Sequence, residues 1–195
     1  MTARSRENVH RPSARISNEV FGMVLLIVAE TMFFAAFVST YVVSRTSAGQ
    51  WRPADLPPLV TPLSIGNSVV LAASGVSMLL ALLAVRRDDP VGLKLYLTIT
   101  CALGLAFVGI QAFEFFRLMQ VVPFGGSSFG NCFYVLGGVH GVHVLAGVIL
   151  LCVVLANAIK GRYHRYRSTG VLLSSFYWWF VVIVWAFLFT ALYVL

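Results

Sequence analysis

Five long apolar runs, separated by short polar or proline-rich stretches, organise this sequence. A helix needs about 20 mostly apolar residues to cross the hydrocarbon core of a bilayer, and each run reaches that length. Backbone groups in hydrocarbon must be hydrogen-bonded internally, so such runs form helices and not isolated strands. The pattern predicts an all-α membrane protein, with a basic arm over residues 1–19 and a domain over 20–195 whose spans cover about 20–43, 64–85, 92–121, 131–158 and 171–195.

Lysine and arginine are distributed unequally between the two ends of this predicted bundle. Four lie in the N-terminal arm, three in the second connection with its flanks, and four in the fourth connection, so that eleven share one side. The other side has three, which are Arg45, Arg52 and Arg117. Because positive residues flanking spans stay in the cytoplasm, we expect a cytoplasmic N-terminus and a periplasmic C-terminus.

The overall composition agrees with an integral membrane protein. The chain has 195 residues, of which 59% are hydrophobic and 11% charged, whereas a soluble domain carries about 25% charged residues. The net charge of +7 does not indicate a nucleic-acid partner, because the basic residues lie outside the apolar runs and form no separate basic domain.

One acidic side chain, Glu30, lies within the first apolar run, in the stretch VAETMFF. An ionised carboxylate is costly in hydrocarbon, so Glu30 is expected to be neutralised, paired or turned toward other protein. Small and aromatic neighbours favour a contact between helices. Two interpretations stay open: a neutral or hydrogen-bonded carboxyl where helices meet, and a proton-relay or lipid-contacting group.

The third run contains QAFEFFR, in which Gln111, Glu114 and Arg117 recur every three residues. This spacing places the three side chains on one face of a helix, near its outer end. We expect a local pair between Glu114 and Arg117, and a catalytic role is the alternative.

The fourth run contains GGVHGVHVLAG, in which His140 and His143 share a helix face. Two histidines at this spacing could bind zinc or iron, with Glu30 or Glu114 completing the site. The Glu-x-x-His pairs of carboxylate-bridged di-iron bundles are missing from the sequence, however. We therefore expect no metal ligand and no catalytic residue here, and hydrogen bonds from the histidines to a neighbouring helix or a lipid headgroup.

Two further patterns concern packing. Gly137 and Gly141 have the four-residue spacing that lets helix backbones approach closely. The stretch SFYWWF, early in the last run, is typical of an aromatic belt at the membrane interface.

Taken together, AETMFFAAFVSTY, QAFEFF, GGVHGVHVLAG and SFYWWFVVIVWAFLFTALYVL resemble, in this order, subunit III of the haem–copper terminal oxidases. The resemblance covers nearly the whole chain after the basic arm. It is to the short bacterial form with five helices, which lacks the first two helices of the seven-helix form. It implies a multi-pass protein of the bacterial inner membrane, with no redox centre of its own, within an oxidoreductase complex of aerobic electron transport.

The resemblance also implies partners and roles. Subunit I is the main partner and subunit II the next, with further small subunits or a respiratory supercomplex left open; haem and copper belong to these partners, and the chain holds phospholipid. The chain would stabilise subunit I and support proton uptake. Cytochrome c is the expected electron donor, and a quinol oxidase or a homologue associated with nitric oxide reductase is the alternative. A metal-binding membrane enzyme and a transporter subunit are the alternatives from other classes.

Site residues follow from the matched motifs. Glu30 matches the family's intramembrane glutamate, which reacts with hydrophobic carbodiimides and would face subunit I and a lipid-filled cleft. Gln111 and Glu114 match its Gln-x-x-Glu motif, and the residues His140 and His143 match its His-Gly-x-His motif.

The last run departs from the family pattern at two positions. Trp179 stands where the family usually has histidine, and Val182 stands where it has aspartate. Without these two groups, we expect Glu30, Glu114 and His140 to find other partners or water, or to stay protonated.

Overall fold

The computed structural model of the chain describes residues 18–49, 51–52 and 58–194. The five predicted spans are confirmed, within four residues at every described end, and each helix is long and apolar enough to cross a membrane. The predicted basic arm lies almost entirely in residues 1–17, outside the described part, and stays a prediction. The elements are α1 (Asn18–Ser47), α2 (Pro62–Arg86), α3 (Pro90–Met119), α4 (Ser128–Ile159), α5 (Thr169–Phe189) and a closing π-helical turn, η1 (Thr190–Val194).

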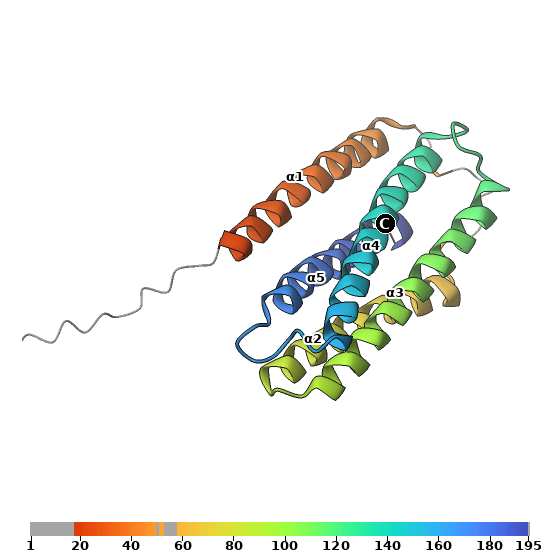
Figure 1. The fold of residues 1–195 in the computed structure, drawn as a ribbon. Coiled ribbons are helices and arrows are strands. Elements are labelled where there is room, and N and C mark those ends of the chain that lie inside the picture. Colours follow the sequence, from red (N-terminus) through yellow and green to blue (C-terminus); the bar gives the residue numbers. More distant parts are fainter. Residues whose placement is uncertain (1–17, 50, 53–57, 195) are drawn as a thin grey trace, which may run out of the picture.

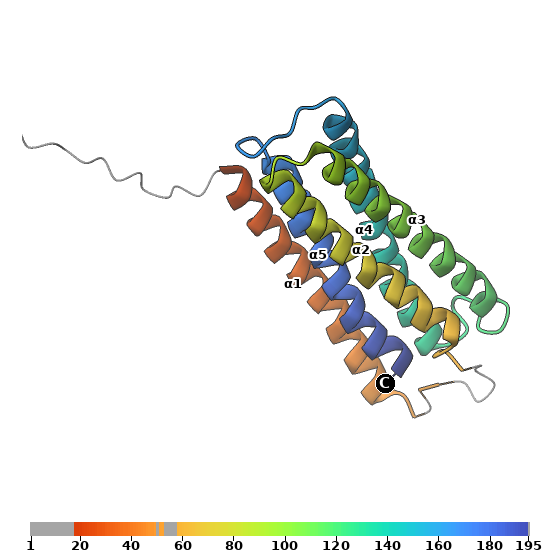
Figure 2. The same cartoon turned by 90° about the horizontal axis from the view of Figure 1, so that it is seen from below.

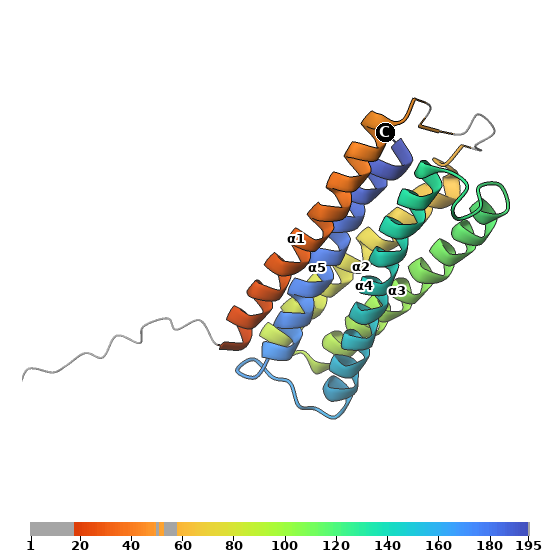
Figure 3. The same cartoon turned by 90° about the horizontal axis from the view of Figure 1, so that it is seen from above.

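The helices lie side by side and alternate in direction (Figures 1–3). α2 packs against α3 and α5, and α4 packs against α3 and α5. α1 is the outermost helix, packs mainly on α4 and α5, and buries only Phe34 and Tyr41. The Tyr41 hydroxyl donates a hydrogen bond to the Ala191 carbonyl at 2.6 Å, which fixes the end of α1 beside the C-terminal turn.

Prolines in the connections between the spans mark where two of the helices begin. Pro62 and Pro90 occupy the first turn of α2 and α3, where a missing N–H costs nothing. Thr61 forms a capping box with Ser64, and the Asp89 side chain accepts hydrogen bonds from backbone N–H groups of the first turn of α3. Sequence signals therefore define both starts locally.

Two connections meet at the end of the bundle where α1 begins (Figure 3). Asp88, between α2 and α3, has a φ of 54° and accepts a hydrogen bond from the Arg165 backbone N–H, between α4 and α5, at 2.5 Å. Both connections contain lysine or arginine residues of the more positive side, so the unequal distribution seen in the sequence distinguishes two real ends of the bundle. The expected orientation, with this end in the cytoplasm, stays a prediction.

The core is built around Trp178 of α5, which is fully buried. Its indole N–H donates to the Ser74 hydroxyl of α2 at 3.0 Å. Gly104 of α3 and Gly147 of α4 flank the ring, since a Cβ at either residue would lie 2.7 Å and 2.9 Å from indole carbons. The expected aromatic belt is therefore wrong for Trp178, which joins helices in the interior.

The predicted close approach at Gly137 and Gly141 is half correct. A Cβ on Gly137 would lie 2.5 Å from the Phe115 ring of α3, so this glycine makes room for an aromatic side chain. A Cβ on Gly141 would meet no atom within 4 Å. The glycine spacing alone does not reveal which side of α4 faces its neighbours.

Candidate functional site

Glu30 of α1 and His143 of α4 form a polar pair between the outermost helix and the rest of the bundle. The Glu30 Oε2 atom lies 2.9 Å from the His143 Nε2 atom. The side chains remain 27% and 15% exposed, respectively, on the outer surface of the chain. Both residues were predicted from the sequence as site residues, and the structure brings them together.

The geometry fixes how many protons this pair carries. The His143 Nδ1 atom lies 2.8 Å from the Val139 carbonyl, which can only accept, so Nδ1 carries a proton. The contact between Nε2 and Glu30 Oε2 then needs one further proton, whether it lies on the imidazole or on the carboxyl. In either arrangement the pair has no net charge, and this neutrality explains how an acidic residue is accommodated within an apolar span.

Neighbouring groups hold the histidine in place. The Phe34 ring centroid lies 5.0 Å from that of His143, and the Tyr177 hydroxyl of α5 donates to the His143 carbonyl at 3.2 Å. The pair therefore has support from α1, α4 and α5.

His140, three residues earlier, lies in an entirely different environment. It is 1% exposed and stacks on Trp185 at 5.2 Å between ring centroids, with the Phe107 ring edge-on at 6.1 Å. Neither ring nitrogen has a hydrogen-bond partner in the described structure, and the expected hydrogen bond to a neighbouring helix is absent for this histidine.

The two histidines consequently do not converge on one point. His143 contacts α1, whereas His140 is enclosed by aromatic rings of the core. Among the described residues, no three His, Cys, Asp or Glu side chains gather as a metal site would require.

A second polar group connects α2, α3 and η1. The Gln111 amide donates to the Tyr193 hydroxyl at 3.0 Å, and this hydroxyl donates to Glu114 Oε2 at 3.4 Å. The Asn67 amide of α2 donates to Gln111 Oε1 at 3.4 Å. The sequence analysis did not identify Asn67 or Tyr193. A polar amide within the apolar second run could have indicated Asn67. Nothing in the sequence distinguished Tyr193 from the other aromatic residues.

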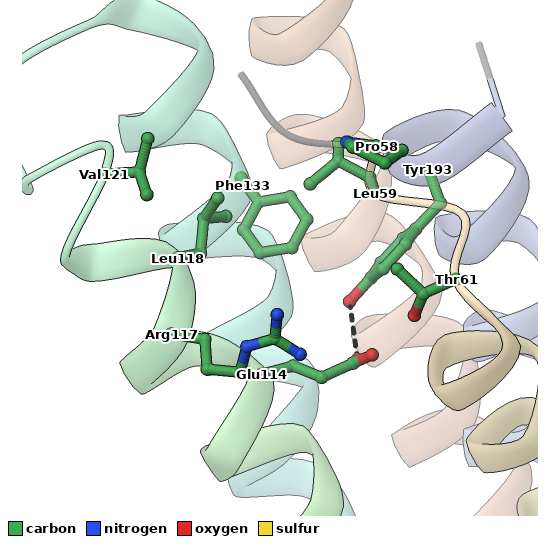
Figure 4. A pocket seen from close by; sticks show the side chains of 9 residues that line it. All are labelled: Pro58, Leu59, Thr61, Glu114, Arg117, Leu118, Val121, Phe133 and Tyr193. Carbon is green, nitrogen blue, oxygen red and sulfur yellow. Dashed lines mark hydrogen bonds between the residues drawn. The ribbon is translucent and has the colours of Figure 1, made fainter. Parts of the chain in front are cut away.

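Glu114 and Arg117 do not form the expected local pair. In the described part of the chain, no carboxylate lies within 4.0 Å of the Arg117 guanidinium, which lies 5.9 Å from the Phe113 ring centroid. Both charged side chains instead line a pocket of about 210 Å³, together with Tyr193 (Figure 4). Its remaining lining residues are Pro58, Leu59, Thr61, Leu118, Val121 and Phe133.

Comparison with known proteins identifies the family. The family model described as Cytochrome c oxidase subunit III matches residues 8–195. This chain belongs to the cytochrome c oxidase subunit III family. It is 36% identical to "Cytochrome c oxidase subunit 3" of Synechocystis sp., over 90% of this chain and 75% of that protein.

Other subunit III relatives are similar over comparable lengths. "Cytochrome c oxidase subunit 3" of Thermostichus vulcanus is 32% identical, over 90% of this chain and 87% of its own. "Probable cytochrome c oxidase subunit 3" of Nocardia farcinica is 32% identical, over 88% and 85%. The chain is thus a multi-pass membrane protein and a subunit III of a haem–copper oxidase, a complex that contains other oxidase subunits.

The two positions that were expected to depart from the family pattern, Trp179 and Val182, lie away from the polar pair. Trp179 and Val182 face Gly75 of α2, where a Cβ would lie 3.6 Å and 3.4 Å from their side-chain atoms. Both fill space between α5 and α2. Glu30 and Glu114 have hydrogen-bond partners on other elements, whereas neither ring nitrogen of His140 has one in the described structure.

Proposed function

We propose that this subunit stabilises oxidase subunit I, the subunit expected to carry haem and copper, and that it does so without a redox centre of its own. The observation that carries the proposal is the Glu30–His143 pair, which is neutral, partly exposed and located where α1 meets α4. A polar pair at such a surface suits a contact with a neighbouring protein helix or a lipid headgroup better than a contact with bare acyl chains.

The surface of α1 supports the same function. Large apolar side chains cover its outer side, among them Phe21, Leu25 and Met32, which are 57%, 53% and 69% exposed. Within the described chain, α1 packs mainly on α4 and α5. A partner helix or lipid must cover this surface, and we assign the Glu30 side of α1 to subunit I and the rest to phospholipid.

We further propose that the pair supports proton uptake by the complex. One proton lies between His143 Nε2 and Glu30 Oε2, at a site that remains partly exposed. Such a pair exchanges its proton without leaving a net charge in the membrane, provided that one is taken up as another leaves. We also place the subunit in the bacterial inner membrane with its N-terminus in the cytoplasm, and propose subunit II as a second partner. Cytochrome c, which the names of the relatives contain, is the proposed electron donor.

Purification of the tagged chain from its native membranes tests this function. We expect subunits I and II, haem and copper to accompany the wild-type chain, and the yield of haem per tagged chain to fall in the variant Glu30→Ala. Purification with no haem-bearing partner would overturn the proposal. Recovery of a quinol-oxidising complex would correct the electron donor.

A further inference from the structure

The pocket beside Glu114 lies at one end of α3, a helix long enough to cross a membrane. Glu114 and Arg117 reach the pocket from the last turns of α3, which ends at Met119. Thr61, the N-cap of α2, and Tyr193 of η1 line the opposite side (Figure 4). At about 1.5 Å per residue, the 30 residues of α3 extend beyond a hydrocarbon core of about 30 Å, so we expect this end of the helix at the depth of lipid headgroups.

Glu114 and Arg117 place opposite charges in this pocket without forming a direct ion pair in the described structure. Glu114 and Arg117 are spaced to pair along the helix, yet no ion pair within 4.0 Å joins them in the described structure. The Glu114 carboxylate has a single hydrogen bond, at 3.4 Å from the Tyr193 hydroxyl, so most of its accepting capacity is free. The Arg117 guanidinium lies 5.9 Å from the Phe113 ring centroid and acts on Glu114 only through space in the described structure.

The remaining walls are apolar. Leu118 and Val121 line the α3 side, and Phe133 lines the α4 side. A ligand that fits this lining therefore has a cationic group, an anionic group and an apolar continuation into the membrane.

We propose that this pocket binds a phospholipid whose headgroup has a phosphate and a primary ammonium, as in phosphatidylethanolamine. Arg117 donates to the phosphate, because guanidinium matches phosphate geometry with paired N–H donors. Glu114 accepts from the ammonium, which has three N–H donors. The glycerol and the first acyl carbons contact Leu118, Val121 and Phe133.

Other headgroups fit the same charges less well. Phosphatidylglycerol offers a phosphate to Arg117 but no cation to Glu114, whose negative charge repels the lipid. Phosphatidylcholine has a quaternary ammonium with no N–H to donate to the carboxylate. The order of affinity is therefore phosphatidylethanolamine first and the other two lipids after it.

This site deepens the lipid-holding part of the proposed function and is separate from Glu30, which lies on α1. The two proposals fail in different experiments. Lipid binding is read from the masses of the subunit and its lipids, whereas the oxidase role is read from haem in the purified complex.

Native mass spectrometry of the full chain, with its partner subunits where they accompany it, tests the site. The three lipids are titrated with identical acyl chains, and soluble phosphoethanolamine separates headgroup binding from lipid binding. The matched control is Arg162→Gln, which neutralises an arginine at the opposite end of the bundle. Far-UV circular dichroism before the titration verifies that each variant is folded.

We expect wild type to bind phosphatidylethanolamine at least fivefold more tightly than the other two lipids, and phosphoethanolamine alone more weakly. Arg117→Gln weakens phosphatidylethanolamine and phosphatidylglycerol about tenfold, as loss of a charged hydrogen bond implies. Glu114→Gln, which retains an acceptor for Tyr193, weakens phosphatidylethanolamine alone. Equal affinity for all three lipids, no effect of Glu114→Gln, or the same effect of Arg117→Gln and Arg162→Gln would overturn the proposal.

Discussion

The Glu30–His143 pair allows a prediction in which two substitutions of one residue have different outcomes. Because the His143 Nδ1 proton is committed to the Val139 carbonyl, Nε2 of a neutral imidazole is an acceptor. A glutamine amide at position 30 can donate to it in place of a protonated carboxyl. Alanine cannot, and it leaves the 2.9 Å contact between α1 and α4 unmade.

The magnitudes follow from the location of the pair. Hydrogen bonds between membrane helices contribute about 0.6 kcal/mol on average and about 1.7 kcal/mol at most. We therefore expect Glu30→Ala to lower the free energy of unfolding by about 1 kcal/mol, and Glu30→Gln to change it by less than about 0.5 kcal/mol. His143→Phe leaves a carboxyl group without its partner and costs more, about 1–3 kcal/mol.

Unfolding of the purified chain by sodium dodecyl sulfate in mild detergent, followed by circular dichroism, measures these differences. The order of stability should be wild type and Glu30→Gln together, then Glu30→Ala, then His143→Phe. If Glu30→Gln cost as much as Glu30→Ala, the pair would be an imidazolium and a carboxylate, and the neutral-acid interpretation would be refuted.

Three other predictions use the same unfolding assay or a labelling assay. His140→Phe should leave stability unchanged or raise it, because the buried imidazole has two nitrogens without partners; a loss above about 1 kcal/mol would indicate a hydrogen bond to His140 that the structure does not contain. Gly147→Ala should cost about 1–3 kcal/mol by forcing the Trp178 ring to move, whereas Gly141→Ala, with open space around it, should be neutral or slightly stabilising; equal effects would contradict the packing. Cysteines introduced over residues 160–168 should react with a membrane-impermeant thiol reagent only from the cytoplasmic side, and labelling of intact cells would reverse the orientation.

Length and hydropathy were enough to predict the five spans, because the bilayer imposes one requirement on each of them. Helix starts were also readable, since Pro62 and Pro90 mark them directly. The sequence did not predict how each helix is rotated about its axis. The helices are apolar on nearly all sides, so the pattern does not show which side packs against the other helices. For this reason Trp178 was expected at the membrane interface and Gly141 in a contact between helices.

For the candidate site, the sequence predicted the residues but not their partners. Glu30, Glu114, Arg117, His140 and His143 were identified from the sequence because charged and imidazole side chains are rare within the spans. Their partners were not, since Glu30 and His143 lie 113 positions apart and Tyr193 lies 79 positions from Glu114. The spacing that placed Glu114 beside Arg117, or His140 beside His143, describes one helix and carries no information about its neighbours.

The most direct test of this account is the metal and haem content of the chain before and after separation from its partners. We predict that the native complex contains haem and copper, and that the separated chain, once folded in detergent, contains neither of these and no stoichiometric zinc or iron. A metal that stays with the separated chain and is lost in the variant His143→Ala would contradict the account, because the histidine would then be a ligand and not the partner of Glu30.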